Sequence, residues 1–180
     1  MMKVNYKVEF LDYWHISLGV SGGARVDSVV VKDNNNLPYI PGKTIKGLAR
    51  EMSELLDEKE TQEIFGEEES SENYIYFSNL TLPKTQADKI VKNSLQEYLY
   101  SEVASTKINE NGVAVDKSLR EIEVVVPLVL EGFVEVKADI KRVEQLKNSL
   151  LMIKRMGLNR NRGLGRCQVQ IVSVEEVSCA

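Results

Sequence analysis

The sequence predicts an α+β domain of the ferredoxin-like class, an antiparallel sheet with helices on one face. Segments with apolar residues at every second position indicate strands, and they alternate with segments whose apolar residues recur three and four positions apart, as in helices. The elements follow the order β-α-β, an inserted helix and hairpin, then β-α-β, which suits this class. Because no linker divides the 180 residues, we expect one domain over residues 1–180.

The first part of the chain predicts a strand, an irregular stretch and a helix. Residues 3–11, "KVNYKVEFL", alternate as a strand does. Residues 12–36 are rich in glycine, serine and asparagine and contain one β-branched run, "VDSVVVKD". Pro41 and Gly42 then begin a helix predicted over residues 43–57. Its apolar stripe consists of Ile45, Leu48, Ala49, Met52, Leu55 and Leu56.

The middle of the chain predicts the inserted helix and hairpin. Residues 74–82, "YIYFSNLTL", read as a strand that Pro83 closes, and residues 85–100 as a helix. A hairpin is predicted over about 101–121, because Asn-Gly at residues 111–112 is the strongest short hairpin signal in the chain.

The last part of the chain repeats the strand-helix-strand pattern. Residues 122–136 are rich in β-forming residues, with Pro127 marking an edge or a bulge. Residues 139–155 read as a helix, and residues 166–177 alternate as a final strand.

Charge and cysteine content exclude several classes of protein. The net charge of −4 argues against an independent, strongly basic nucleic-acid binder, although the strip from Lys154 to Arg166 contains no acid. Cys167, Cys179 and the single His15 are too few for a Cys/His zinc site or a disulfide framework. No apolar run is long enough to span a bilayer, so we expect a cytoplasmic protein without a membrane partner.

The Gly-Lys-Thr at residues 42–44 resembles the end of a phosphate-binding loop. That loop needs a glycine where this chain has Leu37, and Pro38 and Pro41 each remove a backbone N–H donor. A nucleoside triphosphatase is therefore not the favoured interpretation.

A different anion is suggested by the same helix. Gly42 allows a close backbone approach, and the first turn of a helix presents unpaired N–H groups and a positive dipole end. Lys43, Lys46 and Arg50 are three and four residues apart, so they lie on one side of the helix and suit a sugar-phosphate backbone. The alternative is an ordinary solvated helix face.

The second cationic motif is "GLNRNRGLGR" at residues 157–166. Its glycines expose backbone donors, its arginines can bind phosphate oxygens, and its asparagines can meet base edges or ribose hydroxyls. The alternative is a turn whose arginines serve solubility. We expect this loop and the helix after Gly42 to form one trough for a polyanion. The candidate residues of the loop and its approach are Arg155, Asn159, Arg160, Asn161, Arg162, Gly163 and Gly165.

Two acidic residues and a histidine are candidates for chemistry. Asp27 and Asp33 flank "SVVVK", and a carboxylate beside an RNA path can hold a divalent cation or position a 2′-hydroxyl. Either aspartate can equally be a turn residue. His15, beside Trp14, can serve as a general base near neutral pH or fill a structural position.

Taken together, these segments resemble the CRISPR-associated RAMP superfamily. Trp14 to Glu51, with "DSVVV" and "LPYIPGKTIKG", is similar to the N-terminal signature of its type III effector subunits. "GLNRNRGLGRCQVQI" is similar to its C-terminal glycine-rich loop and strand. Residues 108–125 resemble the hairpin that such subunits extend as a thumb over guide RNA.

The resemblance implies an RRM-like fold that takes part in antiviral defence and binds guide RNA along the two cationic segments. It also implies a thumb that displaces a base pair of the guide–target duplex, at Lys117, Leu119 and Arg120. The implied partners are guide RNA, target RNA and other effector-complex subunits, with self-association along the RNA.

The resemblance further implies that Asp27 cleaves target RNA by promoting attack of the neighbouring 2′-hydroxyl, with a divalent metal, Mg²⁺, neutralising the developing charge. Two other roles in the superfamily remain open. One is a non-catalytic scaffold or capping subunit, in which Asp27 is only a loop residue. The other is a metal-independent nuclease that processes precursor guide RNA with His15.

Overall fold

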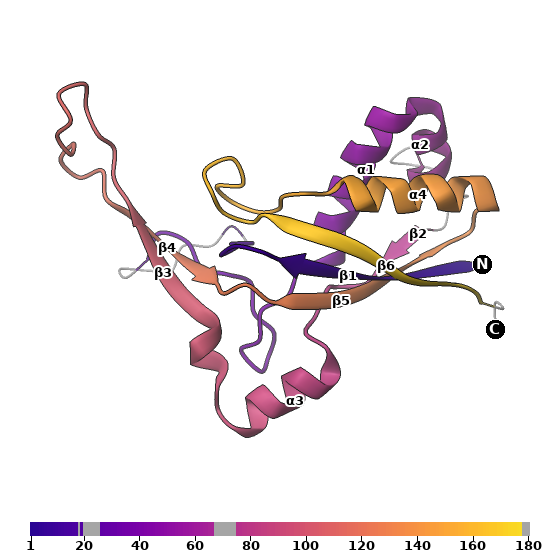
Figure 1. The fold of residues 1–180 in the computed structure, drawn as a ribbon, viewed down its shortest axis with the longest axis horizontal. Coiled ribbons are helices and arrows are strands. Elements are labelled where there is room, and N and C mark those ends of the chain that lie inside the picture. The colour runs from indigo at the N-terminus through magenta and orange to yellow at the C-terminus, as the bar shows by residue number, and fades with distance from the viewer. Residues whose placement is uncertain (18, 20–25, 67–74, 178–180) are drawn as a thin grey trace.

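A four-stranded antiparallel sheet forms the base of the molecule in the computed structural model, which describes all residues except 18, 20–25, 67–74 and 178–180 (Figure 1). The strands lie in the order β2-β5-β1-β6, with every neighbouring pair antiparallel. This order, with the first strand in the interior and helices in the crossovers, confirms the ferredoxin-like arrangement. The strands are β1 (Met2–Phe10), β2 (Ile75–Phe77), β5 (Val129–Val136) and β6 (Cys167–Glu176).

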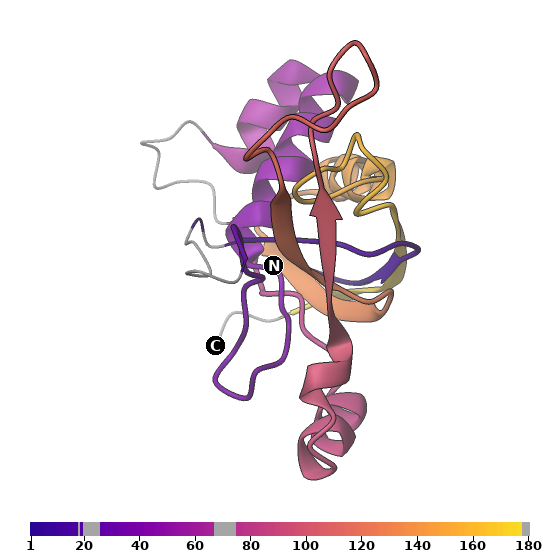
Figure 2. The same ribbon diagram turned by 90° about the vertical axis from the view of Figure 1, so that its left-hand side faces the viewer.

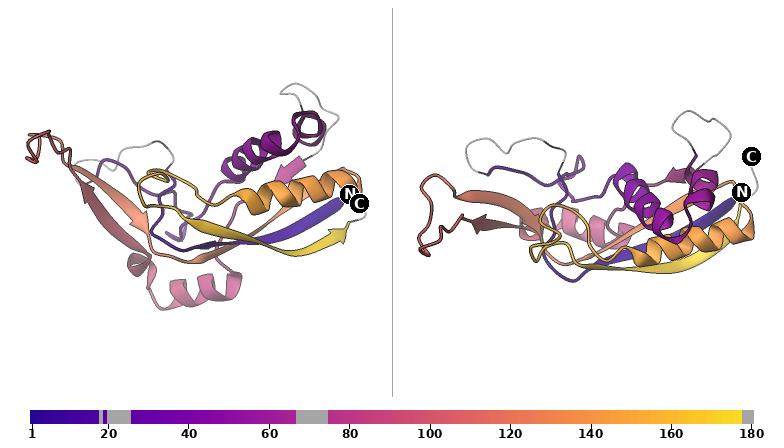
Figure 3. Two further views of the ribbon diagram at one scale, coloured as in Figure 1. Left: turned by 45° about the horizontal axis from the view of Figure 1, so that its top comes forward. Right: turned by 90° about the horizontal axis from the view of Figure 1, so that it is seen from above.

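Helices cover one face of this sheet, as predicted, and there are three of them among the described residues. These are α1 (Gly42–Leu56), α2 (Glu58–Phe65) and α4 (Ile140–Met152), whereas α3 (Lys84–Lys92) lies on the other side of the sheet (Figures 1 and 3). Within the described residues, no helix has the length and apolar content that crossing a membrane requires.

The core lies between the sheet and the three helices. β1 alternates as its sequence predicts, and its inward side chains are buried together with residues of α1 and α4. Burial of apolar surface, at about 25 cal/mol per Å², is the main stabilising contribution to such a core. The central members of this cluster are Val4, Tyr6, Val8, Phe10, Ile45, Ala49, Leu146 and Leu150.

A long hairpin of β3 (Tyr100–Ser105) and β4 (Arg120–Val125) forms a second sheet and projects away from the first (Figures 1 and 2). At its tip the Gly112 N–H donates to the Asn109 carbonyl at 3.0 Å, and Gly112 has a positive φ of 76°. The predicted Asn-Gly turn is therefore confirmed. We call this hairpin the thumb.

Two predicted elements are divided in the structure. The helix predicted over 85–100 is α3 followed by a short 3₁₀-helix, Gln96–Leu99, because Ser94 adopts a left-handed φ of 54° that ends the first helix. The strand predicted over 122–136 is β4 and β5, which belong to different sheets. The chain turns between them at Pro127, which has no N–H to continue a ladder.

Helix α2 was not predicted, and the strand predicted over residues 74–82 is shorter in the structure. Helix α2 occupies part of the acidic segment after α1, where the Asp57 side chain accepts a hydrogen bond from the Glu60 N–H. Carboxylates in a first helical turn are favourable because they face the positive dipole end. β2 has only three residues, and Leu80 pairs instead with Ile40 outside the sheet.

The first glycine of α1 is required by packing within the protein. The Gly42 N–H donates to Asn79 Oδ1 at 2.9 Å, and a Cβ on Gly42 would lie 2.1 Å from the Phe77 carbonyl oxygen. The close approach that Gly42 permits is therefore to the end of β2, which corrects the expectation that it admits a ligand.

This packing predicts opposite effects for two glycines of one helix. Gly42→Ala lowers the free energy of unfolding by at least about 2 kcal/mol, because the Phe77 backbone must move. Gly47→Ala raises the free energy of unfolding by about 0.5–1 kcal/mol, because the new Cβ lies in open space. Urea unfolding of both variants measures the difference, and equal stabilities would contradict the packing argument.

Candidate functional site

Residues 11–17, the connecting segment, run between the thumb and the glycine-rich loop of residues 157–166. On one side, Trp14 and Val125 of β4 exchange backbone hydrogen bonds of 3.1 and 2.8 Å. On the other side, the Leu158 N–H donates to the His15 carbonyl and the Gly165 N–H to the Tyr13 carbonyl. The thumb and the glycine-rich loop are therefore joined through residues 13–15 of the connecting segment.

His15 is a structural residue of this connection. Its side chain is fully buried, and its Nδ1 donates to the Glu123 carbonyl oxygen of β4, while Nε2 lies 2.9 Å from the Ser28 hydroxyl. With both ring nitrogens bonded inside the protein, His15 cannot accept a proton from RNA. The structure thus corrects the expectation of a general base at His15.

Two glycines of the loop allow its close contact with the rest of the protein. Gly157 has φ 89°, and a Cβ there would lie 2.2 Å from the His15 carbonyl oxygen. Gly165 has φ 70°, and its Cβ would lie 1.9 Å from the Met156 carbonyl oxygen. Gly163, with φ 93°, has no atom within 4 Å of its ideal Cβ, so its backbone remains open to a ligand. Asn159 has φ 57° and accepts the Arg162 N–H at its carbonyl, which closes the turn.

Asp27 lies beside the start of β4, at the end of the β3–β4 ladder that is nearer the thumb tip. Its N–H donates to the Glu121 carbonyl at 2.8 Å, and its Oδ2 accepts the Glu121 N–H at 2.9 Å. Its Oδ1 is 3.3 Å from Arg120 Nη1, and 43% of the side chain is exposed. The carboxylate is therefore oriented by the thumb and still accessible from solvent. Asp33 has the predicted alternative role, because its Oδ1 accepts the N–H groups of Asn35 and Leu37 within a turn.

Asp27 is not part of a ready metal site within the described residues. Among them, no three His, Cys, Asp or Glu side chains gather as a metal site, and one oxygen of Asp27 faces Arg120. Mg²⁺ is commonly held by one or two carboxylates together with substrate phosphates. Asp27 fits such an ion only if RNA phosphates provide the remaining ligands.

The two cationic segments lie on opposite flanks of α1. The loop meets α1 where Arg160 is 3.9 Å from Glu51, on the flank that also carries Leu48. Successive residues of a helix are about 100° apart around its axis, so a residue two positions from Leu48 lies about 200° around the axis, nearly on the opposite side of the helix. Lys46 and Arg50 both have this position. The expected single trough is therefore replaced by two cationic surfaces, separated by the exposed top of α1.

Several of the predicted cations already have partners inside the protein. Arg50 pairs with Glu54 at 3.1 Å, Arg160 with Glu51, and Arg166 with Asp12 at 3.0 Å. Arg155 donates to the Arg160 carbonyl at 3.4 Å. Within the described part of the chain, no ion pair involves Lys43, Lys46, Lys154 or Arg162.

The thumb presents apolar side chains to solvent. Leu119 is 60% exposed, and Ile108 and Val113 near the tip are similarly exposed. Lys117 adopts a positive φ of 58° at the turn into β4, and Arg120 is held by Asp27.

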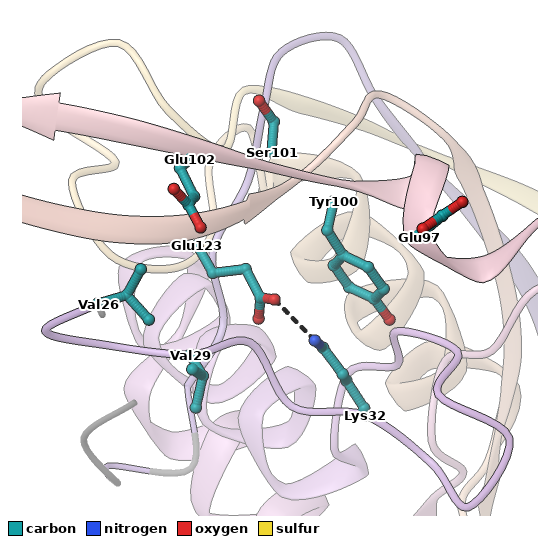
Figure 4. Close-up of a pocket in the computed structure, with 8 residues that line it drawn as sticks. All are labelled: Val26, Val29, Lys32, Glu97, Tyr100, Ser101, Glu102 and Glu123. Carbon is teal, nitrogen blue, oxygen red and sulfur yellow. Dashed lines mark hydrogen bonds and ion pairs between the residues drawn. The ribbon is translucent and has the colours of Figure 1, made fainter. Parts of the chain in front are cut away.

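A hollow of about 540 Å³ beneath the thumb base contains residues that the sequence interpretation did not identify (Figure 4). Glu123 of β4 accepts from Lys32 Nζ at 2.7 Å and from the Val30 N–H at 3.0 Å. The same Lys32 Nζ lies 3.9 Å from the centre of the Tyr100 ring. Burial, with the nearby carboxylates of Glu123 and Asp33, raises the pKa of Tyr100. These contacts fasten the segment after Asp27 to the thumb, and no local sequence pattern indicates them.

The sequence matches the profile of the RAMP superfamily over residues 7–168. A search of curated proteins finds no match. Among solved structures, a chain of the type III-B Cmr-beta complex bound to cognate target RNA is similar, with a TM-score of 0.72, 11% identity, and 94% of this chain and 96% of that chain covered. A chain of the apo Cmr-beta complex has a TM-score of 0.69 and 13% identity, covering 94% and 97%. At these identities the likeness shows the fold.

A structural role for His15 predicts a large loss of stability when it is removed. His15→Ala lowers the free energy of unfolding by about 2–4 kcal/mol, because it leaves a cavity and unpaired polar groups at Ser28 and Glu123. Leu11→Ala, in the same segment but 44% exposed, is the matched control and has a smaller effect. Chemical denaturation measures both. An unchanged stability of His15→Ala would contradict this role.

Proposed function

The chain belongs to the RAMP superfamily, and on that premise we propose that it is a subunit of a type III CRISPR effector complex. It binds guide RNA and cleaves complementary target RNA through Asp27, as part of antiviral defence. The observation that carries this proposal is the Asp27 carboxylate, oriented by the Glu121 N–H, beside the Arg120 guanidinium and accessible at the start of β4. Its partners are guide and target RNA, the other subunits of the complex, and further copies of this chain along the RNA.

RNA binding depends on the cations that have no partner within the described residues. Lys43 and Lys46 on one flank of α1, and Arg162 with the open backbone at Gly163 on the other, present donors to phosphate oxygens. The exposed Gly47 between them leaves room for a sugar-phosphate backbone to cross the first turns of α1. Such contacts hold the backbone without reading its sequence, while base pairing supplies specificity.

Cleavage requires a group that accepts a proton and a cation that meets the developing negative charge. A carboxylate oxygen of Asp27 accepts the proton of the 2′-hydroxyl, whose oxygen attacks the adjacent phosphorus. The bond from phosphorus to the 5′-oxygen breaks, that oxygen takes a proton from water, and a cyclic phosphate forms. The Arg120 guanidinium, 3.3 Å from Asp27, is placed to stabilise the phosphate oxygens. Mg²⁺ held by Asp27 and RNA phosphates would add positive charge at the same place.

The alternative is a scaffold or capping subunit that binds guide RNA without cutting. It is favoured by the hydrogen bonds of Asp27, since both carboxylate oxygens already have partners at Arg120 and Glu121. An aspartate that only fastened the thumb to the loop would make the same contacts. A precursor-processing nuclease is not proposed, because His15 is fully buried.

Asp27→Asn distinguishes the cutting subunit from the scaffold. Asparagine keeps an acceptor for the Glu121 N–H but cannot take up a proton, so the rate of target cleavage falls by about 10²-fold or more. The measurement uses the complex assembled on guide RNA with Mg²⁺ and labelled target, and Asp33→Asn is the control that cuts normally. Undiminished cutting by Asp27→Asn removes Asp27 from the mechanism, and no cutting by the wild type favours the scaffold.

Guide RNA affinity measured against salt concentration tests the phosphate contacts. Arg162→Gln and Lys46→Gln each lower the slope of log K against log salt by about 0.7–1, one phosphate contact per charge removed. Lys89→Gln removes the same charge from α3, on the other side of the sheet, and leaves the slope unchanged. An unchanged slope in Arg162→Gln would mean that the loop does not touch phosphate.

A further inference from the structure

A hollow of about 270 Å³ lies between α1 and the chain that leaves α4. Its apolar lining comes from Leu48 and Met52 of α1, Met152 at the end of α4, and Ile153. Ile153 is buried, Met152 is 36% exposed, and Leu48 and Met52 pack partly against the core. The hollow therefore presents apolar surface to solvent on a floor that two packed helices hold in place.

The rim of the hollow is cationic and polar. Arg155 and Arg160 stand on one side, joined by the Arg155 hydrogen bond to the Arg160 carbonyl, and the exposed Asn161 follows them. Glu51 stands opposite, 3.9 Å from Arg160 Nη1, and neutralises that one charge. Lys154 and Arg155 leave the rim with a net positive charge, which favours an anionic occupant.

An apolar floor, a cationic rim and an adjacent side-chain amide match the chemistry of a nucleotide. The thioethers of Met52 and Met152 make favourable contacts with aromatic rings, and the amide of Asn161 can both donate to and accept from a base edge. The volume lies just below the range of about 300–1,000 Å³ typical of drug-sized ligands, so one base fits better than two.

We propose that this hollow receives one unpaired nucleobase of the bound RNA. The base lies on Met52 and Met152, its edge faces Asn161, and its phosphate meets Arg155. This inference rests on the proposed RNA-binding function and adds to it a contact with a base, where the other contacts are with phosphates. An aromatic side chain of another subunit would fit the floor but would leave Lys154 and Arg155 without an anion.

The test compares two single-stranded RNAs of equal length with the full chain. One is an adenosine homopolymer and the other carries abasic ribose-phosphate units, so that both have the same charge. Fluorescence anisotropy gives the two dissociation constants. We expect the wild type to bind the base-bearing RNA about fivefold more tightly, as the burial of part of one base predicts. Met52→Ala and Met152→Ala each reduce this preference to about twofold or less, and their salt slope is unchanged.

The matched control is Leu55→Ala, which removes an equally apolar but 70% exposed side chain from the same helix and keeps the preference. Met152→Ala, at the helix end, decides the outcome if Met52→Ala does not fold. Equal binding of both RNAs by the wild type, or full preference in both Met variants, overturns the nucleobase site but leaves phosphate binding intact. Binding of neither RNA overturns the proposed function as well.

Discussion

The hydrogen bonds of the connecting segment hold the candidate site together. Trp14 pairs with Val125 of the thumb on one edge, while Tyr13 and His15 accept the N–H groups of the glycine-rich loop on the other. The buried His15 ring adds a contact to the thumb and one to Ser28, the residue after Asp27. Because polar groups in a core are costly to leave unpaired, these contacts fix the thumb, Asp27 and the loop relative to one another.

This arrangement changes how the cationic residues can act. The two cationic segments lie on opposite flanks of α1, and internal ion pairs neutralise Arg160 and Arg166, so among the described residues few of the predicted cations remain without an ion pair. A polyanion that touches both flanks must cross the first turns of α1, where Gly47 leaves open space.

The sequence predicts what local periodicity and turn chemistry determine. β1, α1, α4 and β6 follow their apolar patterns, and the Asn-Gly turn lies at the thumb tip. The roles of Gly42 and His15 depend on partners distant in sequence, Phe77 and Glu123, so no local pattern indicates them. The resemblance implied a functional role for Asp27, whereas its contact with Arg120 is seen only in the fold.

Amide hydrogen exchange followed by NMR is the most direct test that residues 13–15 join the thumb to the glycine-rich loop. The amides of Val125, Leu158 and Gly165 all donate to carbonyls of residues 13–15. The account predicts that these three exchange slowly and with one common opening free energy, close to that of global unfolding. Rapid exchange at Leu158 and Gly165, at the rate of an unstructured loop, together with slow exchange at Val125, would contradict it.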